Sequence, residues 1–325
     1  MLQKCPKLCF VVAAFWTQLA SFSYGVVVAS NPFGNTSAPS GIGSEPTDPG
    51  FGYVGQVKGS TGVYLGNGWV LTADHVGAGN FTLGGTTYNY DGTNSHRIGG
   101  VDLRLFKLSS APALAPLTIS TTTPSLNDDV VMIGAGRKPT GSTPTTWHVD
   151  TDDPANWVWD TSSFPDADTT KSGFITNTTK EVRWGTNVVD GIDTGVTYWS
   201  YAPMEMIVTD FDETGGTAFE SQAVLNDSGS GVFVDHGSGW ELAGTIVDVD
   251  IYDNQPGGNS SALFGNLTHA IDLSSHASEI NGYYLVPVPE SASFALFLLL
   301  SSLLRLSSRR SGVAQAKTRG CRRFL

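Results

Sequence analysis

Residues 226–234 have the sequence Asn-Asp-Ser-Gly-Ser-Gly-Val-Phe-Val, in which Ser228 stands in a glycine-rich turn that leads into an apolar run. Residues 68–76, Gly-Trp-Val-Leu-Thr-Ala-Asp-His-Val, place His75 where another apolar run meets a turn. Residues 101–108, Val-Asp-Leu-Arg-Leu-Phe-Lys-Leu, place Asp102 before a run in which apolar and polar residues alternate. Short β-type runs bounded by Gly, Asn and Asp predict an all-β chain with many turns.

These three polar residues form a chemically complete set. A serine hydroxyl is a weak nucleophile until a neighbouring histidine accepts its proton, and the histidine needs a buried carboxylate to fix its tautomer. We therefore predict His75 as general base and acid, Asp102 as its orienting carboxylate and Ser228 as nucleophile. Gly229 permits a tight turn, so the backbone N–H groups of Asn226 and Ser228 are predicted to form an oxyanion hole.

The same segments resemble the trypsin and chymotrypsin family of serine proteases. Thr72-Ala73-Asp74-His75 is similar to the family's Thr-Ala-Ala-His, residues 102–105 to its Asp-Ile-Ala-Leu, and residues 227–230 to its Asp-Ser-Gly-Gly. The order His, Asp, Ser is also the chymotrypsin order. The resemblance spans about residues 53–275. It implies two six-stranded antiparallel β-barrels and a serine endopeptidase that hydrolyses peptide or protein substrates through an acyl-enzyme.

Several positions depart from the family's pattern. Val76 replaces the cysteine that usually follows the histidine, and Asn226 replaces a glycine. Residues 247–249 stand where the family has a substrate-pairing Ser-Trp-Gly, so Val247 and Val249 are predicted to contact substrate. Gln222, six residues before Ser228, is predicted at the base of the primary pocket. These departures leave open an alternative: a catalytically silent domain that serves as a surface adhesin or matrix-binding protein.

Asp227 raises a question of activation. The resemblance implies that a new N-terminal ammonium meets this carboxylate after cleavage. The nearest candidate for such an N-terminus is Tyr53-Val54-Gly55-Gln56, and no basic cleavage site precedes it. Either the processing differs, or Asp227 has an internal partner.

Charge and cysteine content limit the possible functions. The formal net charge is −12, and all 30 acidic residues lie between Glu45 and Glu290, so we expect no nucleic-acid partner. The cysteines, Cys5, Cys9 and Cys321, lie near the two ends of the sequence. The region between them therefore has no disulfide, thiolate nucleophile or cysteine-bound zinc.

Two acidic groups raise the question of calcium, because clustered oxygens suit a hard cation. They are Asp248, Asp250, Asp253 with Asn254, and Asp210, Asp212 with Glu213. Neither group has the full spacing of an EF-hand loop, and solvated loops are commoner in an acidic chain. We therefore predict no metal site and no cofactor.

The ends of the sequence predict export. Lys4 and Lys7, an apolar run and small residues are typical of a secretory signal peptide, which we place at residues 1–25. Residues 26–50 are rich in Gly, Pro and Ser and are predicted to be a flexible leader. We assign residues 51–284 to the trypsin-like protease domain and residues 285–325 to a C-terminal sorting or anchor segment.

The C-terminal segment resembles the PEP-CTERM sorting signal of Gram-negative bacteria. Pro287-Val288-Pro289-Glu290 stands in place of the usual Pro-Glu-Pro, and an apolar stretch and three arginines follow. The stretch is short for a transmembrane helix. The resemblance implies export through the inner membrane, transient membrane association, cleavage by an exosortase-type sorting enzyme, and release or attachment at the cell surface. An ordinary C-terminal anchor is the alternative.

Overall fold

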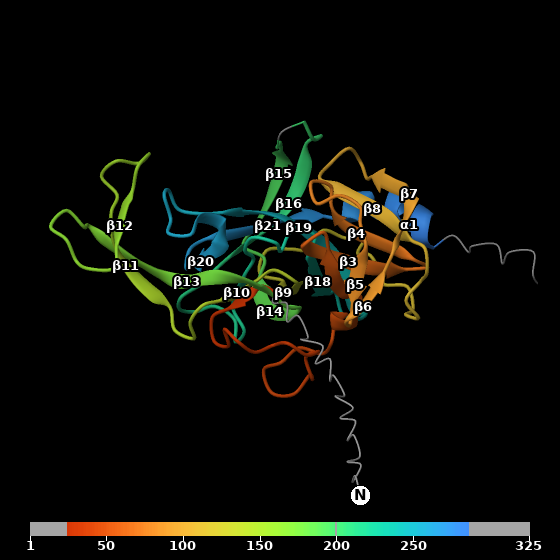
Figure 1. Ribbon diagram of the computed structural model, residues 1–325, viewed down its shortest axis with the longest axis horizontal. Coiled ribbons are helices and arrows are strands. Elements are labelled where there is room, and N and C mark those ends of the chain that lie inside the picture. The colour runs from red at the N-terminus through yellow and green to blue at the C-terminus, as the bar shows by residue number, and fades with distance from the viewer. Residues whose placement is uncertain (1–24, 199, 286–325) are drawn as a thin grey trace, which may run out of the picture.

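The computed structural model describes residues 25–198 and 200–285. The sorting segment at residues 285–325 and the signal peptide at residues 1–25 lie almost wholly outside the described part. Two seven-stranded antiparallel sheets dominate the molecule, and each curls on itself (Figure 1). They form a chymotrypsin-like double β-barrel, which confirms the predicted fold class. Each sheet has one strand more than the six expected.

The first barrel is built from consecutive strands joined by tight turns. Its strand order is β6-β5-β2-β3-β4-β8-β7. Asn67 and Gly68, both with positive φ, make a two-residue hairpin turn between β3 and β4, as the right-handed strand twist favours. The strands are β2 (Val54–Val57), β3 (Ser60–Gly66), β4 (Trp69–Ala73), β5 (Phe81–Leu83), β6 (Thr86–Tyr88), β7 (Tyr90–Arg97) and β8 (Leu103–Leu108).

The second barrel has the order β14-β9-β18-β19-β21-β16-β15. Its strands β9 and β18 are buried almost throughout, since both of their faces are covered. The strands are β9 (Asp129–Gly134), β14 (Arg183–Val188), β15 (Gly191–Val196), β16 (Met204–Asp210), β18 (Gly231–Asp235), β19 (Trp240–Asp250) and β21 (Leu267–Asp272).

A third sheet extends from the second barrel and is made largely from residues 137–180 (Figure 1). A small aromatic core around Trp147, Trp157, Trp159 and Tyr252 stabilises it. The sheet consists of β10 (Arg137–Pro139), β11 (Thr145–Asp150), β12 (Val158–Asp160), β13 (Thr169–Lys180) and β20 (Ser261–Leu263).

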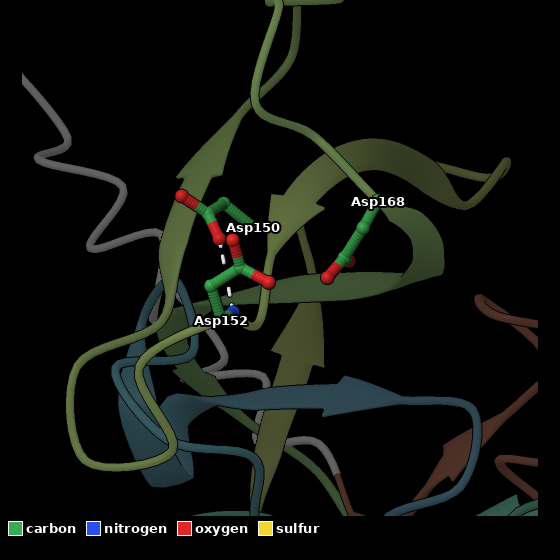
Figure 2. Close-up of side chains that lie close together, drawn as sticks. All are labelled: Asp150, Asp152 and Asp168. Atoms are coloured by element: carbon green, nitrogen blue, oxygen red, sulfur yellow. Dashed lines mark hydrogen bonds between the residues drawn. The ribbon is translucent and has the colours of Figure 1, made fainter.

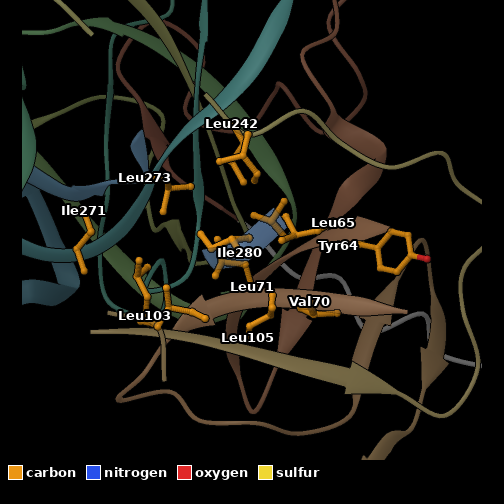
Figure 3. Close-up of a cluster of buried hydrophobic side chains, with 14 of the residues drawn as sticks. Tyr64, Leu65, Val70, Leu71, Leu103, Leu105, Leu242, Ile271, Leu273 and Ile280 are labelled. Atoms are coloured by element: carbon orange, nitrogen blue, oxygen red, sulfur yellow. The ribbon is translucent and has the colours of Figure 1, made fainter. Parts of the chain in front are cut away.

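One apolar cluster joins the two barrels (Figure 3). Leu71 and Leu105 contribute from the first barrel and Leu242 and Ile271 from the second. The helix α1 (Ala277–Tyr284) follows the last strand and adds the fully buried Ile280 to the same cluster. Burial of this shared surface stabilises the pair of barrels as one unit.

Residues 26–50 do not form the flexible leader that their composition suggested. Strand β1 (Val27–Val28) pairs with β17 (Ser221–Gln222), and Val27 and Val28 are fully buried. The guanidinium of the buried Arg183 donates hydrogen bonds to the carbonyls of Asn31 and Gly34, at 2.7 and 2.8 Å. Val26, Val27 and Val28 are all fully buried. Their burial anchors this segment to the folded unit despite its high content of Gly, Pro and Ser.

Candidate active site

His75 and Asp102 meet because β4 and β8 are neighbours in the first barrel. Ala73 at the end of β4 pairs with Leu103 at the start of β8, so the residues just beyond these ends come together. The His75 Nδ1 atom lies 2.6 Å from Asp102 Oδ2, and the backbone N–H of His75 donates to Oδ1 at 2.9 Å. Asp102 is buried, whereas the His75 side chain is 28% exposed. The carboxylate therefore directs the other ring nitrogen toward solvent and the pocket.

Ser228 lies in the turn between β17 and β18, and this turn is tied to the first barrel. Thr61 on β3 donates its backbone N–H to the Ser228 carbonyl at 3.0 Å and its hydroxyl to the Asn226 carbonyl at 3.1 Å. Gly229 has φ +90°, and a Cβ there would lie 2.1 Å from the Thr61 carbonyl oxygen. Only glycine fits at this close approach.

The backbone N–H groups around Ser228 differ in whether they have a hydrogen-bond acceptor. Those of Asp227 and Gly229 donate to the carbonyls of Val224 and Ile246, at 2.9 and 2.7 Å. Within the described part of the chain, the N–H groups of Asn226 and Ser228 have no hydrogen-bond acceptor. Asn226 has φ +82°, a left-handed backbone conformation that glycine adopts readily and that Asn tolerates better than most other residues. Two free donors separated by one residue are suited to a developing oxyanion.

His75, Asp102 and Ser228 line one pocket of about 400 Å³. The lining is mixed: five residues supply apolar walls, and Tyr198, Asp248 and Asn259 add polar groups. The apolar residues are Val224, Leu225, Ile246, Val247 and Val249. The structure thus brings five predicted residues to this pocket: the three triad residues with Val247 and Val249. Asn226 does not line it, although it lies two residues from Ser228.

Gln222 does not line the pocket, so the prediction that it forms the base of the pocket requires correction. It lies on β17 opposite Val27 of β1, is 1% exposed, and donates its side-chain N–H to the Leu267 carbonyl at 3.1 Å. Counting six residues back from Ser228 failed because β1 covers that position. Val224 and Leu225 line the pocket instead.

Asp227 has partners within the protein, which was the second of the two alternatives that the sequence left open. Its fully buried carboxylate accepts hydrogen bonds from the backbone N–H groups of Gly136 and Val224, at 2.9 and 3.0 Å, and from the Ser230 hydroxyl at 3.4 Å. Burial raises the pKa of Asp227 to about 7, against the opposing effect of these donors and of the Arg183 charge.

The two acidic groups considered for calcium are divided among separate partners. Asp250 Oδ2 lies 3.2 Å from His269 Nε2, and Asp253 accepts hydrogen bonds from Trp157 and Trp159. Glu213 accepts from Ser172, and the backbone N–H of Asp212 donates to Glu220. These contacts give the carboxylates of Asp250, Asp253 and Glu213 partners within the protein.

A different trio, Asp150, Asp152 and Asp168, is close together at the edge of the third sheet (Figure 2). Asp150 accepts a hydrogen bond from the Asp152 backbone, and Asp168 accepts one from the Thr151 hydroxyl at 2.7 Å. Asp152 and Asp168 are exposed. Hydrogen bonds within the loop therefore explain this grouping.

Sequence reasoning missed several residues of the site. Thr61, Tyr198 and Tyr201 come from strands and loops that only the tertiary fold brings to the triad, and no local motif marks them. Asp248 was considered only as a calcium ligand. Its position inside residues 247–249 was the signal that it faces the pocket.

No family model and no curated protein matches the chain. The solved structures that it resembles include the active form of the Rv3671c protease of M. tuberculosis, with 13% identity and a TM-score of 0.38 over 69% of this chain and 73% of that chain. Mouse neuropsin, a serine protease, has 13% identity and a TM-score of 0.43 over 72% and 95%. The HtrA-type protease AlgW, solved with a decapeptide, has 16% identity and a TM-score of 0.36 over 70% of this chain; the chain spans about half of AlgW's length.

Proposed function

We propose that the protein is a serine endopeptidase that hydrolyses peptide bonds through an acyl-enzyme on Ser228. The observation that carries this proposal is the joint presence of His75, Asp102 and Ser228 at one pocket, with His75 Nδ1 2.6 Å from Asp102 Oδ2. The Asp102 carboxylate accepts a hydrogen bond from Nδ1–H, which leaves Nε2 as the base that serine activation requires.

The proposed reaction follows from these groups. His75 Nε2 takes the Ser228 hydroxyl proton as Oγ attacks the substrate carbonyl, and the N–H groups of Asn226 and Ser228 receive the oxyanion. The protonated imidazole then gives its proton to the leaving amine, and an acyl-enzyme remains. Water, activated by the same imidazole, hydrolyses the ester and restores the serine.

A fluorophosphonate probe tests this proposal, because it forms a stable bond only with an activated serine. We expect covalent labelling of the wild type and none of Ser228→Ala. The matched control is Ser125→Ala, which removes a serine hydroxyl from a loop outside the site. A folded wild type that takes up no probe would overturn the proposal and favour the adhesin or matrix-binding alternative.

The cellular setting belongs to the same proposal. We propose export through the inner membrane of a Gram-negative bacterium, followed by processing of residues 285–325 by an exosortase-type enzyme. The support is the sequence pattern at residues 1–25 and 286–310. In the described residues, none of the helices has the length and apolarity needed to cross a membrane. Edman sequencing of the mature protein would test cleavage near residue 25.

A further inference from the structure

A second carboxylate, Asp74, lies directly beside the catalytic pair. Its side chain is 3% exposed, and its backbone N–H donates to the Asp102 carbonyl at 3.1 Å. Arg97 Nη2 lies 2.7 Å from Asp74 Oδ2, and Arg104 Nη2 lies 2.5 Å from Oδ1. Two guanidinium groups therefore form ion pairs with one buried carboxylate, one at each oxygen.

Tyr201 connects this group to the catalytic aspartate. It lies between β15 and β16 of the second barrel, and the N–H of the next residue, Ala202, donates to the Gly100 carbonyl of the first barrel at 3.1 Å. The Tyr201 hydroxyl donates to Asp74 Oδ2 at 3.2 Å, and Asp102 is its second hydrogen-bond partner, so the one phenolic proton is shared between two carboxylates. The Arg97 guanidinium lies 5.0 Å from the centre of the tyrosine ring.

We propose that Tyr201 and the arginine-bound Asp74 are positioning residues for catalysis: the Tyr201 hydroxyl orients Asp102, and Asp74 with its two arginines fixes the electric field at His75. This inference rests on the proposed function and deepens it. Neither residue lines the pocket: Tyr201 acts through Asp102, and Asp74 acts through the field of its ion pairs.

The physical reason is charge balance. Asp74 and Asp102 together would place two negative charges beside the imidazole and hold it protonated, which would remove the general base. Arg97 and Arg104 more than offset the charge of Asp74, so Asp102 is the carboxylate whose charge the imidazole experiences most strongly. Burial and the Asp102 and Asp74 charges raise the pKa of Tyr201, so its hydroxyl stays a proton donor across the working pH range.

Other groups also face His75 and belong in the charge balance. Asp248 and Tyr198 line the same pocket, and the Tyr198 hydroxyl forms a hydrogen bond with the Asp248 carboxylate. Lys58 lies close to Gly77, two residues after the histidine, because a Cβ at Gly77 would be 3.1 Å from Lys58 Nζ. None of these groups contacts Asp74, so changes at Asp74 or Tyr201 leave them in place.

The experiment is an NMR titration of histidine ring signals in the full chain carrying Ser228→Ala, which needs no catalytic activity. Tyr201→Phe removes a donor from Asp102, so the imidazolium gains stability and we expect the His75 signals to titrate at a higher pH than in the parent. Asp74→Asn leaves two arginines uncompensated, so we expect the His75 pKa to fall. Arg97→Gln, on an exposed side chain, removes a positive charge and should raise it.

The same variants with Ser228 restored supply a second readout, the pH dependence of fluorophosphonate labelling. Its acid limb should move in the same directions, and Tyr201→Phe should lower the maximal rate by about tenfold, as expected for a lost hydrogen bond to a charged group. Tyr90→Phe is the matched control, because its ring packs on Phe106 in the first barrel, and it should change neither quantity.

Opposite shifts for Tyr201→Phe and Asp74→Asn would support the inference. It would be overturned if the folded variants left the titration of His75 unchanged, or if Tyr201→Phe and Asp74→Asn moved it in one common direction. A folded Arg97→Gln variant that moved it to lower pH, or not at all, would overturn it as well. Arg97→Gln keeps the test decisive if Asp74→Asn fails to fold. Absence of labelling in the wild type would instead contradict the proposed function, and the titration would still decide the role of Tyr201.

Discussion

Gly229 illustrates how closely single residues constrain this site. Its φ of +90° and its approach to the Thr61 carbonyl leave no space for a side chain. The turn that carries Ser228 can therefore rest directly against the first barrel, where His75 lies. A methyl group at this position would push Ser228 away from His75.

We predict that Gly229→Ala lowers the rate of fluorophosphonate labelling by about a hundredfold, the size of effect seen when an oxyanion-hole donor is lost. The displaced turn would carry the Asn226 and Ser228 N–H groups with it. Gly52→Ala is the control, because a Cβ there has open space, and it should label like the wild type. Labelling of Gly229→Ala at the wild-type rate would contradict the proposed arrangement of the turn.

Asp227 predicts a particular dependence of stability on pH. Its pKa is raised by burial from the ordinary value of 3.8 to about 7 in the folded state. Between these values the folded state holds a proton that the unfolded state has released, so this group's contribution to stability falls as the pH rises from about 4 to about 7. Thermal melts should show the midpoint of Asp227→Asn, relative to wild type, increasing over that interval. A difference that stays flat, or decreases, would contradict the assigned shift.

Among the elements, β19 shapes the pocket. It contributes Ile246, Val247 and Val249 as apolar wall and Asp248 as the one carboxylate in the lining besides Asp102, within the described residues. The charges of Asp248 and Asp250 assist burial in raising the pKa of Tyr198 to about 12. We therefore predict that the pocket accepts an apolar substrate residue beside a basic one.

We expect Asp248→Asn to lower kcat/KM for peptides carrying Lys or Arg near the scissile bond by about fivefold, the effect of losing a partly exposed ion pair of about 1 kcal/mol. Peptides with neutral residues at that place should be unaffected. Asp129→Asn, on the exposed end of β9, is the charge-matched control. A peptide-library digest measures the cleavage of basic and neutral peptides side by side. An equal loss for the two kinds of peptide would contradict the prediction that Asp248 binds a basic substrate residue.

The elements also explain what could be predicted from the sequence. Segments 68–76, 101–108 and 226–234 carry local turn and strand signals, so His75, Asp102 and Ser228 were identified together with the β class. Tyr201 and Thr61 reach the site through pairings that local pattern does not encode. The third sheet was missed for a similar reason, since β13 is completed by β20, about 90 residues later in the chain. Gln222 was misplaced because the pairing of β1 with β17 cannot be seen from spacing.

At the scale of the whole molecule, the shared core makes the site depend on both barrels. The first barrel supplies His75 and Asp102, whereas the second supplies Ser228, and the apolar cluster with Ile280 holds them together (Figure 3). Helix α1 strengthens this connection, because the Tyr284 hydroxyl donates to the Leu117 carbonyl at 2.6 Å. Weakening the core should therefore affect both barrels at once.

Ile280→Ala tests this dependence. Removal of a fully buried isoleucine side chain should lower the free energy of unfolding by about 2–5 kcal/mol. We expect one cooperative transition at lower denaturant concentration, followed by tryptophan fluorescence and circular dichroism. Ile42→Ala, at a position that is 76% exposed, should behave like the wild type. Two separate transitions in the variant would show that the barrels unfold independently.

The measurement that tests the central claim most directly is a burst titration with a p-nitrophenyl ester. If Ser228 forms an acyl-enzyme, the wild type should release about one nitrophenolate per folded chain in a rapid phase before slow turnover. Ser228→Ala and His75→Ala should lose this phase while keeping the fold. A burst of equal size in Ser228→Ala, or none in the folded wild type, would contradict the account.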